Sequence, residues 1–87
     1  MEKFEVLFKQ SVAKDLRPIP KKDVSKILKR IEALKTNPRP PGVEKLSGQA
    51  LYRIRQGVYR IVYEIKNDEV VIIVVKIGHR RDVYRVS

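Results

Sequence analysis

The chain has 87 residues, which is enough for one hydrophobic core and too few for two, so we expect a single domain over residues 1–87. Hydrophobic residues make up 43% and charged residues 34%, a balance that excludes a disordered chain. With no cysteine and a single histidine, His79, we expect no disulfide, no metal site and no cofactor. The formal net charge of +10 indicates a polyanionic partner, either nucleic acid, an acidic protein or both.

The sequence contains nothing that resembles a targeting or membrane-spanning segment. Residues 1–4 lack an apolar targeting core, and the longest apolar run, residues 70–75, is far shorter than a membrane span. We therefore expect a cytoplasmic protein without membrane contact.

The first half predicts one strand followed by two helices. Residues 4–8 are rich in strand formers, and Ser11 is a candidate N-cap for a short helix over residues 12–17. Pro20 suits the first turn of a second helix. Its buried stripe has the spacing of one helix face and consists of Val24, Ile27, Leu28, Ile31 and Leu34. The proline-rich residues 37–42 end this helix and form an extended linker.

The second half predicts an antiparallel meander of three strands. They span residues 50–55, 58–66 and 69–78, with turns at Gln56-Gly57 and Asn67-Asp68. Residues 69–75 show no polar alternation, which favours a strand at the centre of the sheet, covered on both faces. The fold class is α+β, with two N-terminal helices packed on a mainly antiparallel four-stranded sheet.

A Gln56-Gly57 turn would place Arg53 directly opposite Arg60 and Arg55 opposite Val58. Alternation then separates an apolar face from a cationic face that carries the three arginines. The apolar face contains Tyr52, Ile54, Tyr59, Ile61 and Tyr63. Opposed like charges destabilise a sheet by about 0.2–1 kcal/mol per pair, a cost that a bound anion removes.

Arginine is concentrated in the second half of the chain. Residues 1–49 contain three arginines and nine lysines, whereas residues 50–87 contain six arginines and two lysines. Guanidinium groups bind phosphate bidentately, so Arg53, Arg55, Arg60, Arg80 and Arg81 are candidate phosphate ligands. Tyr84 follows the cationic turn and is a candidate for stacking on an unstacked RNA base.

Each of these features also has a purely structural interpretation. The helix lysines suit a solvated face, and the three tyrosines of the apolar face suit a core. His79 alone fits either a surface residue or a proton carrier, since imidazole titrates near neutral pH. There is no phosphate-binding glycine loop, serine elbow or zinc spacing. A metal-free phosphodiester reaction, in which the 2′-hydroxyl of RNA attacks the neighbouring phosphate, stays open.

Two segments resemble the RelE/ParE toxin superfamily, namely residues 51–65, LYRIRQGVYRIVYEI, and residues 76–84, KIGHRRDVY. With the linker 37–42 and residues 45–48, the resemblance covers nearly the whole chain. It implies a curved sheet with a cationic concave face opposite the helices. RelE-like members cut messenger RNA in the ribosomal A site without metal and leave a cyclic phosphate. An antitoxin holds each of them inactive.

The resemblance also implies roles for the catalytic candidates. Arg53 and Arg55 occupy positions where the family has basic residues that orient or protonate the scissile phosphate. Arg60, and either Arg80 or Arg81, match phosphate-stabilising arginines, and Tyr84 matches the base-stacking tyrosine. Well-known RelE members have lysine where this chain has Arg53 and Arg55, and arginine scarcely releases a proton. His79 is therefore the candidate general acid or base.

Three functions follow as hypotheses. The first is the toxin of a type II toxin–antitoxin system, a ribosome-dependent mRNA endonuclease that inhibits translation. The second is a ParE-like inhibitor of DNA gyrase without ribonuclease activity, and the third is a non-toxic module that binds an antitoxin. All three predict an acidic cognate antitoxin and a toxin–antitoxin hetero-oligomer.

Overall fold

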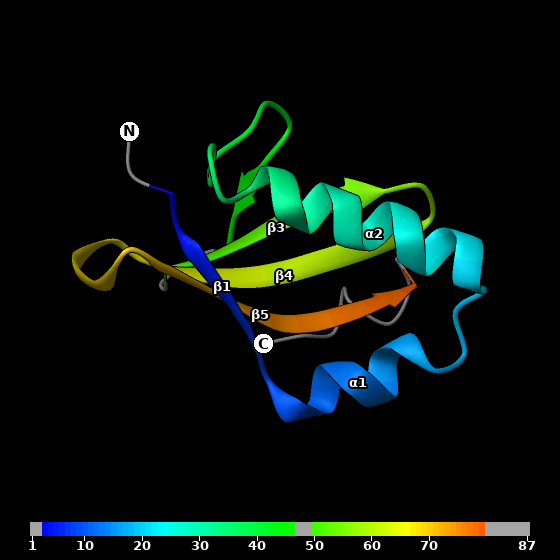
Figure 1. Cartoon of the computed structure of the whole chain (residues 1–87). Helices are drawn as coiled ribbons and strands as arrows, with labels where there is room; N and C mark the ends of the chain where they lie inside the picture. The colour runs from blue at the N-terminus through cyan, green and yellow to red at the C-terminus, as the bar shows by residue number, and fades with distance from the viewer. Residues whose placement is uncertain (1–2, 47–49, 80–87) are drawn as a thin grey trace.

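The computed structural model describes residues 3–46 and 50–79, which form two α-helices and a five-stranded sheet (Figure 1). Chain order is β1 (Glu5–Phe8), α1 (Gln10–Leu16), α2 (Lys21–Ala33), β2 (Glu44–Lys45), β3 (Leu51–Gln56), β4 (Tyr59–Lys66), the 3-10 helix η1 (Asn67–Glu69) and β5 (Val71–His79). In space the strands follow the order β1-β5-β4-β3-β2. Among the strand pairs of the described residues, only β1–β5 is parallel. The expected α+β class is confirmed, with one strand more than expected.

Both helices begin close to the expected positions. The N-cap of α1 is Lys9, so this helix starts before Ser11, which was the expected cap. Pro20 is the N-cap of α2, where its fixed φ of −55° suits the entry into the helix. Leu28 was expected in the buried stripe of α2 but is 42% exposed, whereas Ile27 is fully buried. Within the described parts of the chain, neither helix has the length and apolar character needed to cross a membrane.

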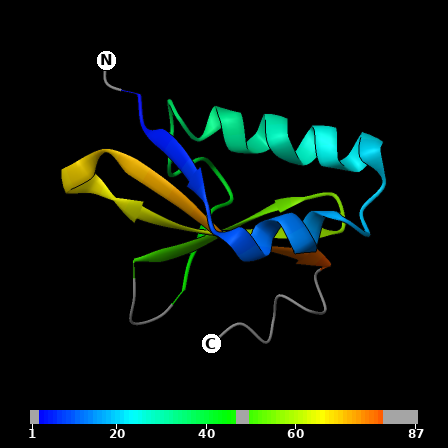
Figure 2. The same ribbon diagram turned by 60° about the horizontal axis from the view of Figure 1, so that its bottom comes forward.

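The core lies between the helices and one face of the sheet. One buried cluster joins the two helices, the residues just after each of them and the three long strands. Its members are Val12, Ile19, Ile27, Ile31, Leu34, Tyr52, Ile54, Ile61, Tyr63, Ile65, Ile72, Val74 and Ile77. Figures 1 and 2 show α2 lying across the sheet and α1 lying beside β5. The predicted core role of Tyr52 and Tyr63 is confirmed, while Tyr59 is only partly buried.

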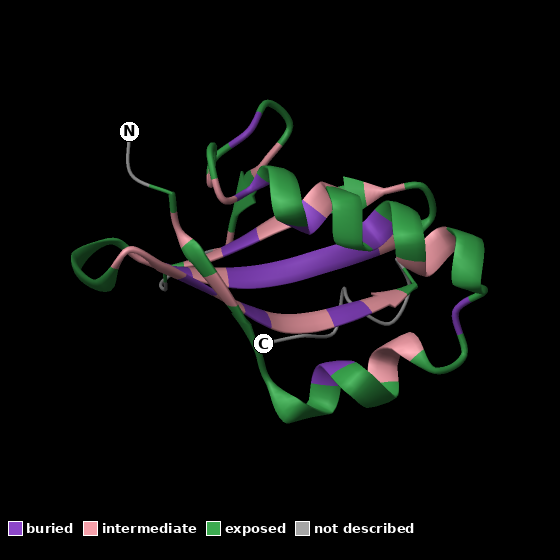
Figure 3. Ribbon diagram, viewed as in Figure 1, coloured by how far each residue is buried: buried purple, intermediate pink, exposed green. Residues whose placement is uncertain are grey.

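The centre of the sheet is β4, not the apolar run 69–75 as expected. Residues 60–63 of β4 are all buried, and Figure 3 shows this strand as the most continuously buried element. β5 lies next to it, but β1 pairs only with Val71 to Val74 and leaves the second half of β5 without a strand on its outer side. The polar residues in the sequence of β4 made a central position hard to predict. One of them, Arg60, is buried in the folded protein.

The linker after α2 is attached to the sheet rather than extended freely. The hydroxyl of Tyr63 donates a 2.7 Å hydrogen bond to the carbonyl of Pro38. Arg39 Nε donates to the hydroxyl of Tyr52 at 3.3 Å, and the two tyrosine rings stack at 5.9 Å between centroids. These contacts lead the chain into β2, the short edge strand that was not expected.

The hairpin between β4 and β5 differs from the expected two-residue turn. It is formed by η1 followed by Val70, which adopts the left-handed conformation with φ of 55°. A β-branched residue in this region is strained, because its Cβ crowds the backbone.

Candidate nucleic-acid interface

Arg53, Arg55 and Arg60 lie on one face of the β3–β4 hairpin, as alternation predicted, but with different partners. Arg55 pairs with Arg60, and Arg53 pairs with Val62. The predicted Arg53–Arg60 pairing is therefore wrong, although two of the three arginines still oppose each other directly.

The turn explains this difference. The two-residue loop is Gly57-Val58, with Gly57 at φ of +61° and Val58 at negative φ, the pattern of a turn that needs glycine only at its first central position. Moving the turn by one residue shifts every partner by two. Because side chains alternate with a period of two, the faces are unchanged.

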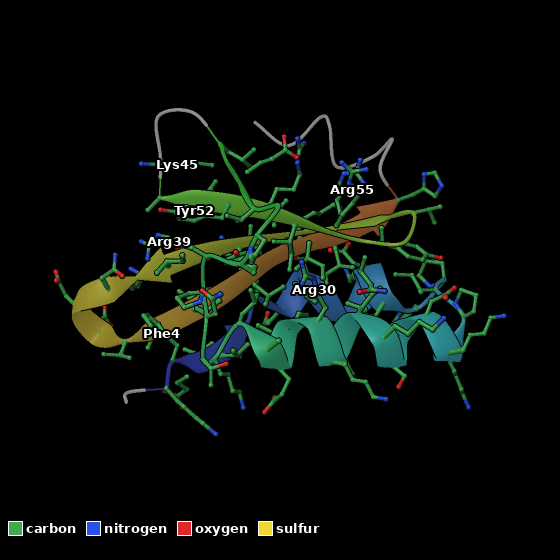
Figure 4. All side chains as sticks on the ribbon, turned by 90° about the horizontal axis from the view of Figure 1, so that it is seen from above. Phe4, Arg30, Arg39, Lys45, Tyr52 and Arg55 are labelled. Carbon is green, nitrogen blue, oxygen red and sulfur yellow. The ribbon has the colours of Figure 1, made fainter. Side chains whose placement is uncertain are left out.

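The cationic face is the one opposite the described helices. Figure 4 shows Arg55 on the side of the sheet away from α2, while Arg30 lies on the α2 side. Val62, which pairs with Arg53, is fully buried yet stands outside the core cluster beneath the helices. The two faces of this hairpin therefore have separate environments, one apolar and one cationic.

Arg53 is held in place by an acidic neighbour. Its guanidinium donates from Nη2 to Oε2 of Glu44 at 3.1 Å, and Glu44 is its partner in the β2–β3 ladder. The Arg53 side chain is 16% exposed and the Glu44 side chain 55% exposed. The pair orders the guanidinium and partly offsets the charge at this end of the cationic face.

Arg60 is the most buried charged residue among those that the structure describes, with 5% exposure. A charge in such a position acts in a lower effective dielectric than a surface charge, so it interacts more strongly with a nearby phosphate. Exposed Arg55 stands directly across the ladder from it. Together they present two guanidinium groups to one region of the sheet.

A bulge in β5 adds a lysine to this face. Val62 pairs with Lys76 but Tyr63 pairs with Val74, so Val75 is an extra residue in the ladder. Without this bulge, alternation from Val74 would direct Lys76 toward the helices. With it, Lys76 joins the Arg53–Val62 row, and Gly78 follows in the Arg55–Arg60 row.

His79 does not lie in the arginine rows. It pairs with Tyr59 at the end of the β4–β5 ladder, and the two rings meet edge to face at 6.3 Å between centroids. Since Tyr59 packs against the core cluster, His79 belongs to the row on the helix side. The remaining candidates, Arg80, Arg81 and Tyr84, lie outside the described residues.

Asp15 of α1 anchors the outer edge of β5. Its Oδ2 accepts a 3.1 Å hydrogen bond from the amide of Ile77, and its Oδ1 lies 3.3 Å from Nζ of Lys76. The carboxylate thus replaces the strand partner that β1 does not supply to this half of β5. The strand that leads to His79 is thereby attached to α1.

Comparison with known proteins assigns the family. A family described as the ParE toxin of type II toxin–antitoxin systems matches residues 6–84. A protein of Methanocaldococcus jannaschii that carries the name toxin RelE1 is 37% identical over 87 residues, covering 95% of this chain and 97% of the relative. The chain belongs to the RelE/ParE toxin family.

Solved structures of RelE agree with this membership. The RelE–RelB complex of Pyrococcus horikoshii OT3 contains a chain with a TM-score of 0.81 and 31% identity, over 90% of this chain and 96% of that chain. The RelB–RelE antitoxin–toxin complex of Methanococcus jannaschii gives a TM-score of 0.71 and 30% identity, over 90% and 94% of the two chains. The family suggested by the sequence is confirmed.

Three residues near the site of this RelE/ParE family member were not expected from its sequence. The short strand β2 brings in Glu44, the bulge in β5 brings in Lys76, and the packing of α1 brings in Asp15. The Asp15 contacts join residues 61 and 62 positions apart, so no local pattern reveals them. The isolated lysine in an otherwise apolar and aliphatic strand was the one available signal.

Proposed function

We propose that this RelE/ParE family member is a toxin that cleaves messenger RNA in the ribosomal A site. The observation that supports it best is the pair of directly opposed arginines, one of them buried, on the sheet face away from the helices. Adjacent guanidinium groups have the charge and the planar donor geometry that bind a phosphodiester bidentately. The other contributors are Arg53 and Arg80 or Arg81 as further phosphate ligands, and Tyr84 as the stacking ring.

The proposed reaction uses the side chains of the arginines and of His79. The 2′-oxygen forms a bond to phosphorus while the bond from phosphorus to the 5′-oxygen breaks, leaving a cyclic phosphate and a 5′-hydroxyl. The arginines stabilise the charge that develops on the non-bridging oxygens. His79 accepts the 2′-hydroxyl proton and returns a proton to the leaving oxygen. Gly78, its neighbour in the chain, ends the Arg55–Arg60 row, and His79 itself follows at the end of β5 in the row on the helix side.

The decisive test is primer extension on an mRNA during translation in a purified system, with ribosome-free RNA alongside. New stops are expected only in the translated sample. Arg60→Ala should lower cleavage by roughly two to three orders of magnitude, the usual cost of one charge-stabilising group. Arg17→Ala, which removes a cation from an exposed position at the end of α1, is the matched control.

Because Arg60 is buried, its replacement could also weaken the fold, so exposed Arg55→Ala is tested in parallel and both variants are checked by thermal denaturation. Full cleavage by folded Arg60→Ala would remove the site assignment. Unchanged activity and pH profile in His79→Ala would exclude the proposed proton carrier while leaving the phosphate site intact.

A second candidate is a ParE-like inhibitor of DNA gyrase, which the family description over residues 6–84 favours. In that case the translated mRNA should show no new stops. Purified gyrase should lose supercoiling activity when the protein is added, and cells expressing it should accumulate gyrase-dependent DNA damage.

We further propose an acidic antitoxin as the partner in a hetero-oligomer. The chain carries a net charge of +10, and the two archaeal relatives above were solved with RelB antitoxin. Growth arrest on expression, reversed by coexpression of the product of a neighbouring acidic gene, is the expected outcome. No growth arrest would support the non-toxic binding role.

A further inference from the structure

A pocket of about 390 Å³ lies where α1 and the α1–α2 connection meet the far ends of β4 and β5. This volume falls in the range of roughly 300–1,000 Å³ that small-ligand sites occupy. Its lining includes Lys14, Pro18, Ile19, Tyr59, Gly78 and His79. The pocket is separate from the arginine rows, which lie on the other face of the sheet.

The pocket lining combines apolar side chains with a lysine and a histidine. Pro18, Ile19 and the half-buried ring of Tyr59 offer flat or aliphatic surface. Lys14 is exposed at the rim, and His79 stands at the end of β5. A ligand with a planar ring for the apolar residues and a negative charge for Lys14 matches this lining, and a nucleotide has both features.

The one carboxylate in the lining does not oppose such a ligand. Asp15 is only 13% exposed, and its two oxygens already bind the amide of Ile77 and the ammonium of Lys76. Its negative charge is therefore offset by Lys76, and Lys14 remains to attract an anion.

Gly78 connects the pocket with the cationic face. It pairs with Arg60 and so ends the Arg55–Arg60 row, and it also lines the pocket. Gly78 adds no side chain between the arginines and the pocket, which suits a polynucleotide that contacts both. A chain with a phosphate at Arg60 would bring a neighbouring nucleotide to the pocket.

We infer that this pocket binds a nucleotide of single-stranded RNA that flanks the phosphate held by the arginines. The inference rests on the proposed function, since it assigns a second subsite to the same substrate. An acidic peptide would satisfy Lys14, but it lacks the planar ring that suits Tyr59 and Pro18. The continuity through Gly78 also favours a ligand that occupies the arginine rows at the same time.

The test measures binding separately from cleavage. A short single-stranded RNA with 2′-O-methyl groups cannot be cut, and its affinity for the full chain is measured by fluorescence anisotropy at fixed ionic strength. Lys14→Glu should weaken binding roughly tenfold more than Lys29→Glu, because only Lys14 contacts the nucleotide. Lys29 is exposed on α2 and gives the same change in net charge. Thermal denaturation shows that both variants are folded.

Nuclear magnetic resonance locates the ligand. Adding a nucleoside monophosphate should shift the amide signals of Ile77 and Gly78 and the ring signals of Tyr59.

Three results would overturn the inference. They are equal losses of RNA affinity in the two lysine variants, signal shifts elsewhere in the protein, or shifts produced by an acidic peptide and not by the nucleotide. If the pocket binds RNA while translated mRNA stays intact, the proposed function fails and the subsite stands. If cleavage occurs and Lys14→Glu binds RNA as well as Lys29→Glu does, the proposed function stands and the subsite fails.

Discussion

Asp15 carries two contacts that tie the beginning of the chain to its far half. The carboxylate accepts a 3.1 Å hydrogen bond from the amide of Ile77 and forms a 3.3 Å ion pair with Lys76. It is largely buried. Removing an acceptor from a buried amide exposes the full cost of its desolvation, whereas an ion pair whose lysine is more than a third exposed contributes less. The hydrogen bond is therefore the more important of the two contacts.

Asp15→Ala should lower the free energy of unfolding by about 1–3 kcal/mol because the Ile77 amide loses its acceptor. Asp15→Asn keeps an acceptor oxygen and should lose less than half as much. Urea denaturation gives the energies, and hydrogen exchange at Ile77 should accelerate in the alanine variant alone. Asp68→Ala, on the exposed η1 turn, is the control and should change neither. Equal destabilisation by the alanine and asparagine variants would contradict this account.

Val70 is a second residue whose effect is local. Its φ of 55° costs a β-branched residue about 1–2 kcal/mol, while glycine in its place adds roughly 0.5–1 kcal/mol of backbone entropy to the unfolded chain. Val70→Gly should therefore raise the stability by up to about 1 kcal/mol in urea denaturation. Val58→Gly makes the same change at negative φ in the other hairpin and should destabilise. A loss of stability in both variants would show that Val70 is not strained.

At the scale of elements, the linker after α2 is fastened through Tyr63. Its hydroxyl is bound to the carbonyl of Pro38 at 2.7 Å, and its ring is fully buried. Burial raises the pKa of Tyr63 from 10.0 to about 12, which the nearby Arg30 opposes only in part. The folded protein thus keeps this proton to higher pH than the unfolded chain does.

The raised pKa of Tyr63 predicts that the folded protein loses stability at alkaline pH. Between about pH 10 and 12 the unfolded chain loses the Tyr63 proton and the folded protein retains it, so stability falls as pH rises. The slope contributed by this group approaches about 1.4 kcal/mol per pH unit. Tyr63→Phe should cost about 1 kcal/mol at neutral pH through the lost hydrogen bond. Its stability relative to wild type should then improve on going to alkaline pH in urea denaturation. Parallel pH curves for the two proteins would rule out this role of burial.

At the scale of the whole molecule, net charge of +10 and the opposed Arg55–Arg60 pair make the folded state sensitive to anions. Phosphate at the proposed arginine site should stabilise the folded state by an amount that grows with the logarithm of its concentration relative to its dissociation constant. We expect phosphate to raise the melting temperature more than chloride at equal ionic strength. Arg55→Gln should lose most of this difference and gain stability in chloride, by about 0.2–1 kcal/mol. Lys29→Gln, with the same change in charge, should keep it.

The β3–β4 hairpin shows which features of a sheet can be predicted from local sequence and which cannot. Alternation between Tyr52 and Tyr63 predicted both faces correctly, because the period of a strand does not depend on its partner. The pairing of Arg53 was wrong, because the position of the turn depends on which residue accepts a positive φ, and that residue is Gly57 at the first rather than the second central position. The central position was assigned to residues 69–75 for a related reason, since burial of Arg60 in β4 is invisible in composition.

The sequence by itself determined the α+β class, the family, the cationic and apolar faces of β3 and β4, and the core role of Tyr52 and Tyr63. These follow from composition, period and motif, which are local properties. Only the tertiary structure decided which arginines face each other, that β4 is central, that a bulge turns Lys76 onto the cationic face, and that His79 lies beside Tyr59. It also decided that Asp15 closes the edge of β5. Each of these depends on contacts between distant segments, whose geometry is set by packing.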